Sequence, residues 1–121
     1  MIGPKPLVVR LERTLQIGIK PAHLAMSVDS RKKVVTVSLY IDNGDKDENK
    51  EFFDTLRQAR AEIEEALGRL DWHRLDDKRA SIVSVSKKLD FQSAGDRESA
   101  VRWLVETGDR FIEVFTAYGR P

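Results

Sequence analysis

Apolar and polar residues alternate with a period of two in several short stretches of this chain, which is the pattern of half-buried strands. Residues 34–41 show it most clearly, with Val35, Val37, Leu39 and Ile41 on one side and Thr36, Ser38 and Tyr40 on the other. Residues 22–28 precede them across a polar connection at 29–33, so the two segments predict a β-hairpin. A second hairpin is expected from residues 71–76 and 79–85, around a turn at Asp76, Asp77 and Lys78.

Residues 7–20 also alternate, and we expect a strand that ends before Pro21, because proline cannot donate a ladder hydrogen bond. Leu7, Leu11 and Leu15 lie at helical spacing as well, so a helix stays an open alternative. An alternating strand at a sheet edge would invite pairing with a second copy or with a partner protein.

Two longer segments carry an apolar stripe at helical spacing. The first covers residues 47–67; acidic residues from Asp45 onward gather at its start, and Gly68 follows its end, free to adopt a positive φ. The second covers about 96–118 and contains Gly108, which either lets another element approach closely or marks a bend. The stripes comprise Phe52, Phe53, Leu56, Ile63, Ala66 and Leu67 in the first helix, and Ala100, Val101, Leu104, Val105, Phe111, Ile112, Phe115 and Tyr118 in the second.

The order β-β-α-β-β-α predicts one α+β domain over residues 1–121. It divides into an N-terminal segment at 1–20, a first ββα unit at 21–68 and a second at 69–121. A length of 121 residues fits a single domain. We expect two layers, an antiparallel sheet of four or five strands with two helices on one face, the fifth being an extra N-terminal strand.

Composition narrows the function. The chain is 40% hydrophobic and 34% charged, as in folded globular proteins. A formal net charge of +1 creates no global attraction to nucleic acid or membranes, so any such attraction must come from a local patch. The absence of cysteine excludes a disulfide framework and a thiolate metal site. No apolar run approaches the roughly 20 residues that span a bilayer, so we expect a cytoplasmic protein without a membrane partner.

Candidate catalytic residues are few, and we expect no enzyme. His73 is followed by Asp76 and Asp77, but a general base needs a carboxylate about 3 Å away. On a strand His73 would face opposite to Trp72 and Arg74, and the two acids would lie in the turn beyond, so nothing fixes such a contact. Glu48 and Lys50 form the E-x-K fragment of restriction-type nucleases. They fall in the first turn of a helix rather than on a core strand, where acids could converge on a metal ion.

A metal site would need His23 and His73 to lie on neighbouring strands with a carboxylate between them. No two ligands have the local spacing of a known site, so we expect no metal and no cofactor. A small hydrolase that uses Glu48, Lys50 or His73 is the catalytic alternative, and it requires these side chains to line one pocket.

Basic residues gather at the tips of the two predicted hairpins. Arg31, Lys32 and Lys33 occupy the first tip, and Lys78 and Arg79 the second. If the hairpins run side by side, the tips project together, and these five cations would contact the DNA or RNA backbone without reading bases. Lys87 and Lys88 follow the last strand.

The chain from Gly18 to about Phe115 resembles a bacterial family known only as a domain of unknown function. The resemblance is strongest in Leu-Asp-Trp-His-Arg-Leu at 70–75 and Lys-Arg-Ala-Ser-Ile at 78–82. The segments 23–25, 37–42, 52–56, 63–68, 103–104 and 111–115 complete it. Members of that family often lie C-terminal to a restriction-endonuclease-like domain. The resemblance therefore implies an accessory role in DNA processing or defence beside a nuclease partner, and it supplies no catalytic residue.

The sequence thus predicts a non-enzymatic binding module that contacts nucleic-acid phosphates through basic hairpin tips. The alternative is a protein-interaction or homodimerisation module without nucleic-acid binding. Its contact surface would be the segment 7–20 or the last helix.

Overall fold

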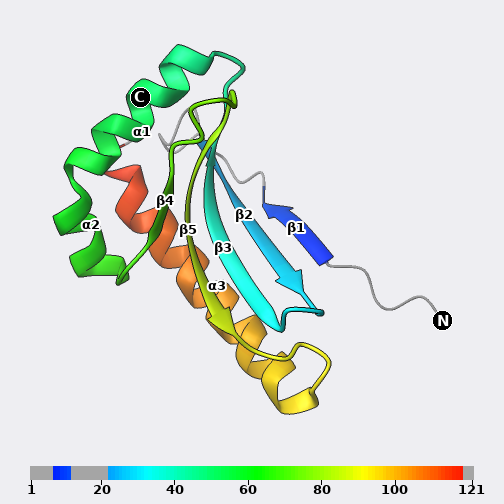
Figure 1. Ribbon diagram of the computed structural model, residues 1–121. Helices are drawn as coiled ribbons and strands as arrows, with labels where there is room; N and C mark the ends of the chain where they lie inside the picture. Colours follow the sequence, from blue (N-terminus) through cyan, green and yellow to red (C-terminus); the bar gives the residue numbers. More distant parts are fainter. Residues whose placement is uncertain (1–6, 12–21, 119–121) are drawn as a thin grey trace.

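The computed structural model describes residues 7–11 and 22–118, and Figure 1 shows a curved sheet with helices packed against it. The elements are β1 (Leu7–Leu11), β2 (Ala22–Asp29), β3 (Val34–Ile41), α1 (Lys46–Gln58), α2 (Arg60–Leu67), β4 (Asp71–His73), β5 (Ser81–Lys88) and α3 (Ala94–Thr116). The predicted α+β class is confirmed.

The strands form one antiparallel sheet in the order β1-β2-β3-β5-β4. β3 pairs with β5 along its whole length, from Val34 opposite Lys88 to Ile41 opposite Ser81. β1 and β4 are the two edge strands. The strand predicted within 7–20 is confirmed for Leu7–Leu11, and residues 12–20 lie outside the described part of the chain.

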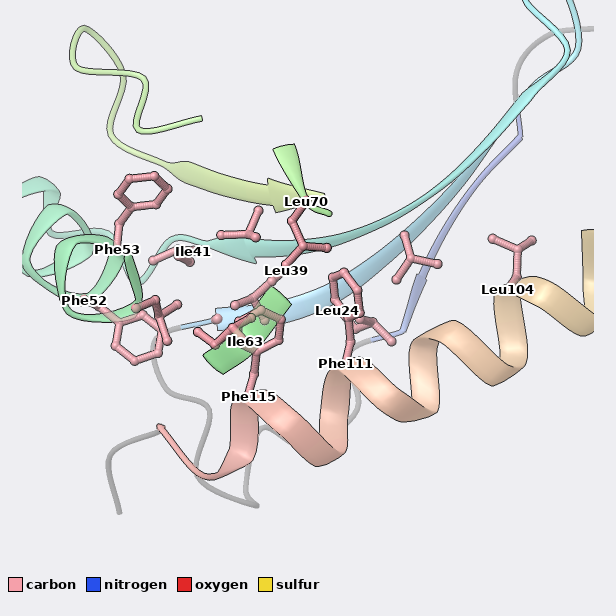
Figure 2. Close-up of a cluster of buried hydrophobic side chains, with 14 of the residues drawn as sticks. Leu24, Leu39, Ile41, Phe52, Phe53, Ile63, Leu70, Leu104, Phe111 and Phe115 are labelled. Atoms are coloured by element: carbon pink, nitrogen blue, oxygen red, sulfur yellow. The ribbon is translucent and has the colours of Figure 1, made fainter. Parts of the chain in front are cut away.

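The core lies between one face of the sheet and the helices (Figure 2). The alternation predicted for β3 is confirmed, because every second residue from Val35 to Ile41 is buried. Phe52, Phe53 and Leu56 of α1 and Phe111 and Phe115 of α3 close over that face. Burial of each such side chain contributes about 1.5–3 kcal/mol, so this face holds the layers together.

The signals at the ends of the first predicted helix are confirmed. The side chain of Asp45 caps α1 by accepting a hydrogen bond from the backbone N–H of Glu48. Gly68 follows α2 with φ of 83°, a conformation that glycine adopts without a Cβ clash.

The single helix predicted over residues 47–67 is wrong, because the chain bends at Ala59 and forms two helices. Ala59 has φ of −96° and ψ of 17°, and its N–H bonds back to the carbonyl of Leu56. The bend turns α2 toward α3 and buries Ile63 completely. Tertiary packing thus interrupts a segment with good helix propensity.

The predicted bounds of the second hairpin are also wrong. β4 ends at His73 rather than Asp76, and β5 runs from Ser81 to Lys88 rather than from Arg79 to Val85. The cause is Lys50 on α1, whose ammonium group binds backbone carbonyls in the connection between the strands and holds that connection away from the sheet.

In α3, Gly108 permits a close approach between the helix and β2. A Cβ at this position would lie 2.5 Å from Cε of Met26 and 3.2 Å from Cδ2 of Leu24. The predicted apolar stripe of this helix was too wide, because Val101 and Val105 are 49% and 53% exposed. They lie on the flank of α3, and the buried stripe consists of Ala100, Leu104, Gly108, Phe111 and Phe115.

Candidate functional site

The two predicted basic tips lie at opposite ends of the sheet, so the expectation that they project together is wrong. The hairpins do run side by side, but they meet through β3 and β5, which are antiparallel. This pairing places the β2–β3 turn beside Lys88 and the β4–β5 connection beside Ile41. Lys78 and Arg79 are therefore separated from Arg31, Lys32 and Lys33 by the length of the strands.

The register creates a different cluster, which we call the basic end. It consists of Arg31, Lys32, Lys33, Lys87 and Lys88. All five side chains are exposed. Within residues 22–118 none of them forms an ion pair with a carboxylate. Lys87 and Lys88 were noted in the sequence, but only the pairing of β3 with β5 joins them to the turn.

Hydrogen bonds from the backbone fix the shape of the β2–β3 turn. One carboxylate oxygen of Asp29 accepts the N–H groups of Arg31 and Lys32, each at 3.0 Å. The bond from the Lys32 N–H lowers the pKa of Asp29, and the Arg31 N–H adds to this effect. Lys33 then takes φ of 55° and leads into β3. Since backbone groups hold the turn, the cationic side chains stay in solvent.

At the other end of the sheet, Arg79 has a structural role. Its guanidinium donates two hydrogen bonds of 2.9 Å to the carboxylate of Asp42. This bidentate pair lowers the pKa of Asp42 and raises the pKa of Arg79. Asn49 of α1 also donates to the backbone carbonyl of Arg79. Of the two cations predicted for this tip, Arg79 is bound to Asp42, and Lys78 extends into solvent.

The two charged side chains of the E-x-K fragment have separate structural partners. Lys50 is buried, and its Nζ donates to the carbonyls of Arg74, Leu75 and Ala80 at 2.5–2.9 Å. The carboxylate of Glu48 accepts a hydrogen bond from the side chain of Asn43 instead. A lysine whose hydrogen bonds are all directed at a loop has none left for a substrate.

The two histidines are far apart. His23, Tyr40, Ile82 and His73 occupy one row across β2, β3, β5 and β4, so three strand spacings separate the imidazoles, roughly 14 Å. Asp76 pairs with Arg74 at 2.6 Å rather than with His73. Within the described ranges, no three histidine or carboxylate side chains are arranged to hold a metal ion.

A hollow of about 490 Å³ lies beside α1, where the hydrolase alternative would require a pocket. Three of its charged groups are paired with one another: Arg74 binds Asp54 through two hydrogen bonds of 2.9 and 3.0 Å and also binds Asp76. The Arg74 guanidinium lowers the pKa of Asp54, which keeps that carboxyl ionised. Lys50 borders this hollow, but Glu48 and His73 do not line it.

The sheet face opposite the helices is lined mainly by small polar side chains. Thr36 and Ser86 share a hydrogen bond of 2.8 Å across β3 and β5. The rings of His23 and Tyr40 lie 5.0 Å apart at an angle of 32°. This face ends at Lys88 and so continues into the basic end.

The alternative interaction surface includes β1, which pairs only with β2 among the described strands. Its use by a second copy or a partner stays a prediction. Within the residues that the structure describes, no helix is long and apolar enough to cross a membrane.

Fold and site together define a small α+β domain with cations concentrated at one end of its sheet. A family model described as "Domain of unknown function (DUF4268)" matches residues 13–119, so this protein belongs to that family. The match agrees with the resemblance noted in the sequence, whose bacterial setting and nuclease neighbour stay predictions. No curated protein and no solved structure matches the chain.

Proposed function

We propose that this domain is a non-enzymatic binding module that contacts the phosphate backbone of DNA or RNA through its basic end. It would act in the bacterial cytoplasm, as an accessory to DNA processing or defence beside a nuclease partner. The observation that carries the proposal is the convergence of Arg31, Lys32 and Lys33 with Lys87 and Lys88.

The state of these cations supports phosphate contact. Arg74 and Arg79 are bound to carboxylates, whereas the five side chains of the basic end extend into solvent. Neutralising phosphates releases condensed counterions, so such a cluster gives an affinity that falls steeply with salt. A turn held by Asp29 and backbone amides presents its charges without relying on them for folding.

The test is a fluorescence-anisotropy titration of labelled single-stranded DNA, duplex DNA and RNA at about 50 and about 200 mM salt. We expect binding at the lower concentration and a loss of at least about tenfold in affinity at the higher one. The double variant Arg31→Glu with Lys32→Glu should bind at least about tenfold more weakly. Its salt slope should be smaller by about 2, since two phosphate contacts are removed.

The matched control carries the same change of charge at the far end of the sheet, as Lys46→Glu with Lys78→Glu. Both lysines are exposed, and their side chains form no ion pair within residues 22–118. We expect affinity within about threefold of the original chain, because the effect of a remote charge is screened over about 10 Å. Equal losses in the two double variants, or no binding of any probe at the lower salt, would refute the proposal.

A further inference from the structure

The last half of β5 has a strand on only one side. β4 pairs with Ile82, Val83 and Ser84, whereas β5 continues to Lys88 (Figure 1). Before β4 the chain is tied to α2 instead, where the N–H of Leu70 donates to the carboxylate of Glu64 at 2.8 Å. Within the described residues, the stretch 85–88 therefore forms an open sheet edge.

The direction of the peptide groups along this edge follows from one hydrogen bond. The N–H of Leu89 donates to the carbonyl of Lys33 at 2.9 Å, one step beyond the paired residues Val34 and Lys88. Peptide groups alternate in direction along an antiparallel ladder. Lys87 therefore faces β3, whereas Ser86 and Lys88 direct their N–H and C=O groups outward. Within residues 22–118 no other backbone group pairs with these outward groups.

Helix α3 forms a wall beside this edge, and Trp103 is its central side chain. A hollow of about 110 Å³ on one side of the indole is lined by Leu67, Val85, Trp103, Thr107 and Arg110. A second hollow of about 230 Å³ is lined by Lys87, Ser99, Arg102, Trp103 and Glu106. The indole is half-buried between the two hollows, which we together call the trough. The trough therefore has an apolar floor and a polar rim.

The rim carries more positive than negative charge. Among the residues that line the two hollows, Lys87, Arg102 and Arg110 are basic and Glu106 is acidic. Arg102 lies 3.8 Å from Glu98 in an exposed pair, which contributes little. Arg110 donates to the backbone carbonyl of Ala66 and forms no ion pair within residues 22–118.

We propose that this trough binds an extended segment of a partner protein as an added strand along residues 85–88. Backbone hydrogen bonds to Ser86 and Lys88 would give affinity. Apolar side chains at alternate positions would lie against Trp103, and acidic side chains would face the cations of the rim. This partner site shares Lys87 and Lys88 with the basic end but does not include Arg31 and Lys32, so variants at these two residues test the phosphate contacts separately.

The experiment uses a proline as a probe of the outward N–H. Ser86→Pro removes that donor but leaves the ladder with β3 intact, since the backbone N–H of Ser86 faces away from β3. Ser86→Ala is the control, because both variants lose the hydroxyl contact with Thr36. The probes are a labelled, capped peptide of alternating valine and aspartate, and the same peptide with lysine in place of aspartate.

Anisotropy and amide NMR spectra report the result. We expect the aspartate peptide to bind the full chain and to shift the amide signals of Ser86 and Lys88 and the indole signal of Trp103. Ser86→Ala should bind within about twofold of the original chain, and Ser86→Pro at least about tenfold more weakly. The lysine peptide should bind at least about tenfold more weakly than the aspartate peptide.

Equal binding by the two Ser86 variants, shifts confined to other surfaces, or equal affinity for both peptides would overturn the proposal. If Ser86→Pro fails to fold, Trp103→Ala and Val105→Ala replace the pair. Val105 lies on the opposite flank of α3 and is exposed, so only Trp103→Ala should weaken peptide binding. Loss of nucleic-acid binding in Arg31→Glu with Lys32→Glu is measured independently of this outcome.

Discussion

Lys50 shows how one side chain can organise a loop. Only 6% of it is exposed, and its ammonium group reaches three backbone carbonyls and the hydroxyl of Ser81. Burial lowers the pKa of Lys50, because desolvation penalises the charged form. The carbonyl dipoles replace the lost water, so the buried charge is tolerated and the residues between β4 and β5 are drawn toward α1.

Replacing this lysine should therefore destabilise the fold. In Lys50→Met the buried carbonyl of Ala80 loses its donor, whereas the carbonyls of Arg74 and Leu75 keep the hydroxyl of Ser81 and the N–H of Lys78. A buried acceptor without a partner costs about 1–3 kcal/mol, and we expect the free energy of unfolding to fall by about that amount in urea titrations. Lys46→Met changes an exposed lysine of the same helix and should alter it by no more than about 0.5 kcal/mol. Equal stability of the two variants would show that the ammonium group is dispensable.

The sequence contained a trace of this arrangement. Asn49 and Lys50 precede Phe52 and Phe53 by one helical turn, so two polar side chains lie on the buried side of α1. A polar pair in that position indicates buried hydrogen bonds. Their acceptors could not be predicted, because they lie some 25–30 positions further along the chain.

At the scale of elements, the sequence pattern predicted the features that depend on interactions between residues close together in the chain. The bounds of β3 and the cap of α1 agree with the sequence, because alternation and a capping aspartate act within a few residues. The break at Ala59 has no local signal, since alanine is the best helix former. The pairing of β3 with β5 is a long-range choice, and it decided which cations meet at one end of the sheet.

The contact between α3 and β2 depends on the missing side chain of Gly108. Gly108→Val should lower the free energy of unfolding by about 1–2 kcal/mol, because Cδ2 of Leu24 must give way in a packed layer, while Cε of Met26, the end of a flexible side chain, can move aside. Gly95→Val is the matched control in the same helix, since a Cβ there meets no atom within 4 Å. Its stability should stay within about 0.5 kcal/mol of the original chain. Identical urea midpoints for the two variants would contradict the close approach.

At the scale of the whole molecule, three carboxylates join separate elements of the fold. Asp42 holds Arg79, Asp54 holds Arg74, and Glu64 accepts the N–H of Leu70. Each of these bonds lowers the pKa of its carboxyl group relative to the unfolded chain.

The sign of the resulting pH dependence is fixed. In the unfolded chain these groups bind protons near their ordinary pKa of about 4. The folded state binds them only at lower pH, so stability falls as the pH falls. The stabilisation should be complete above about pH 5 and lost progressively below about pH 4. Urea midpoints between about pH 7 and about pH 2.5 measure it.

Asp42→Asn should make the acid loss shallower, because its carboxylate is only 15% exposed and carries the bidentate pair with Arg79. Asp77→Asn changes an exposed carboxyl group of the β4–β5 connection and should keep the original profile. A midpoint that does not change with pH would contradict the role assigned to these three groups.

Glu64 has one further consequence. Its carboxylate also accepts the indole N–H of Trp72 at 3.4 Å, and that ring meets Phe53 edge-on at 6.0 Å. The indole thus contacts both α1 and α2. We expect the wavelength of its fluorescence maximum to depend on whether α2 is packed in place. In a Trp103→Phe background Trp72 is the only tryptophan. The wavelength of its fluorescence maximum then reports whether α2 is packed against the rest of the domain.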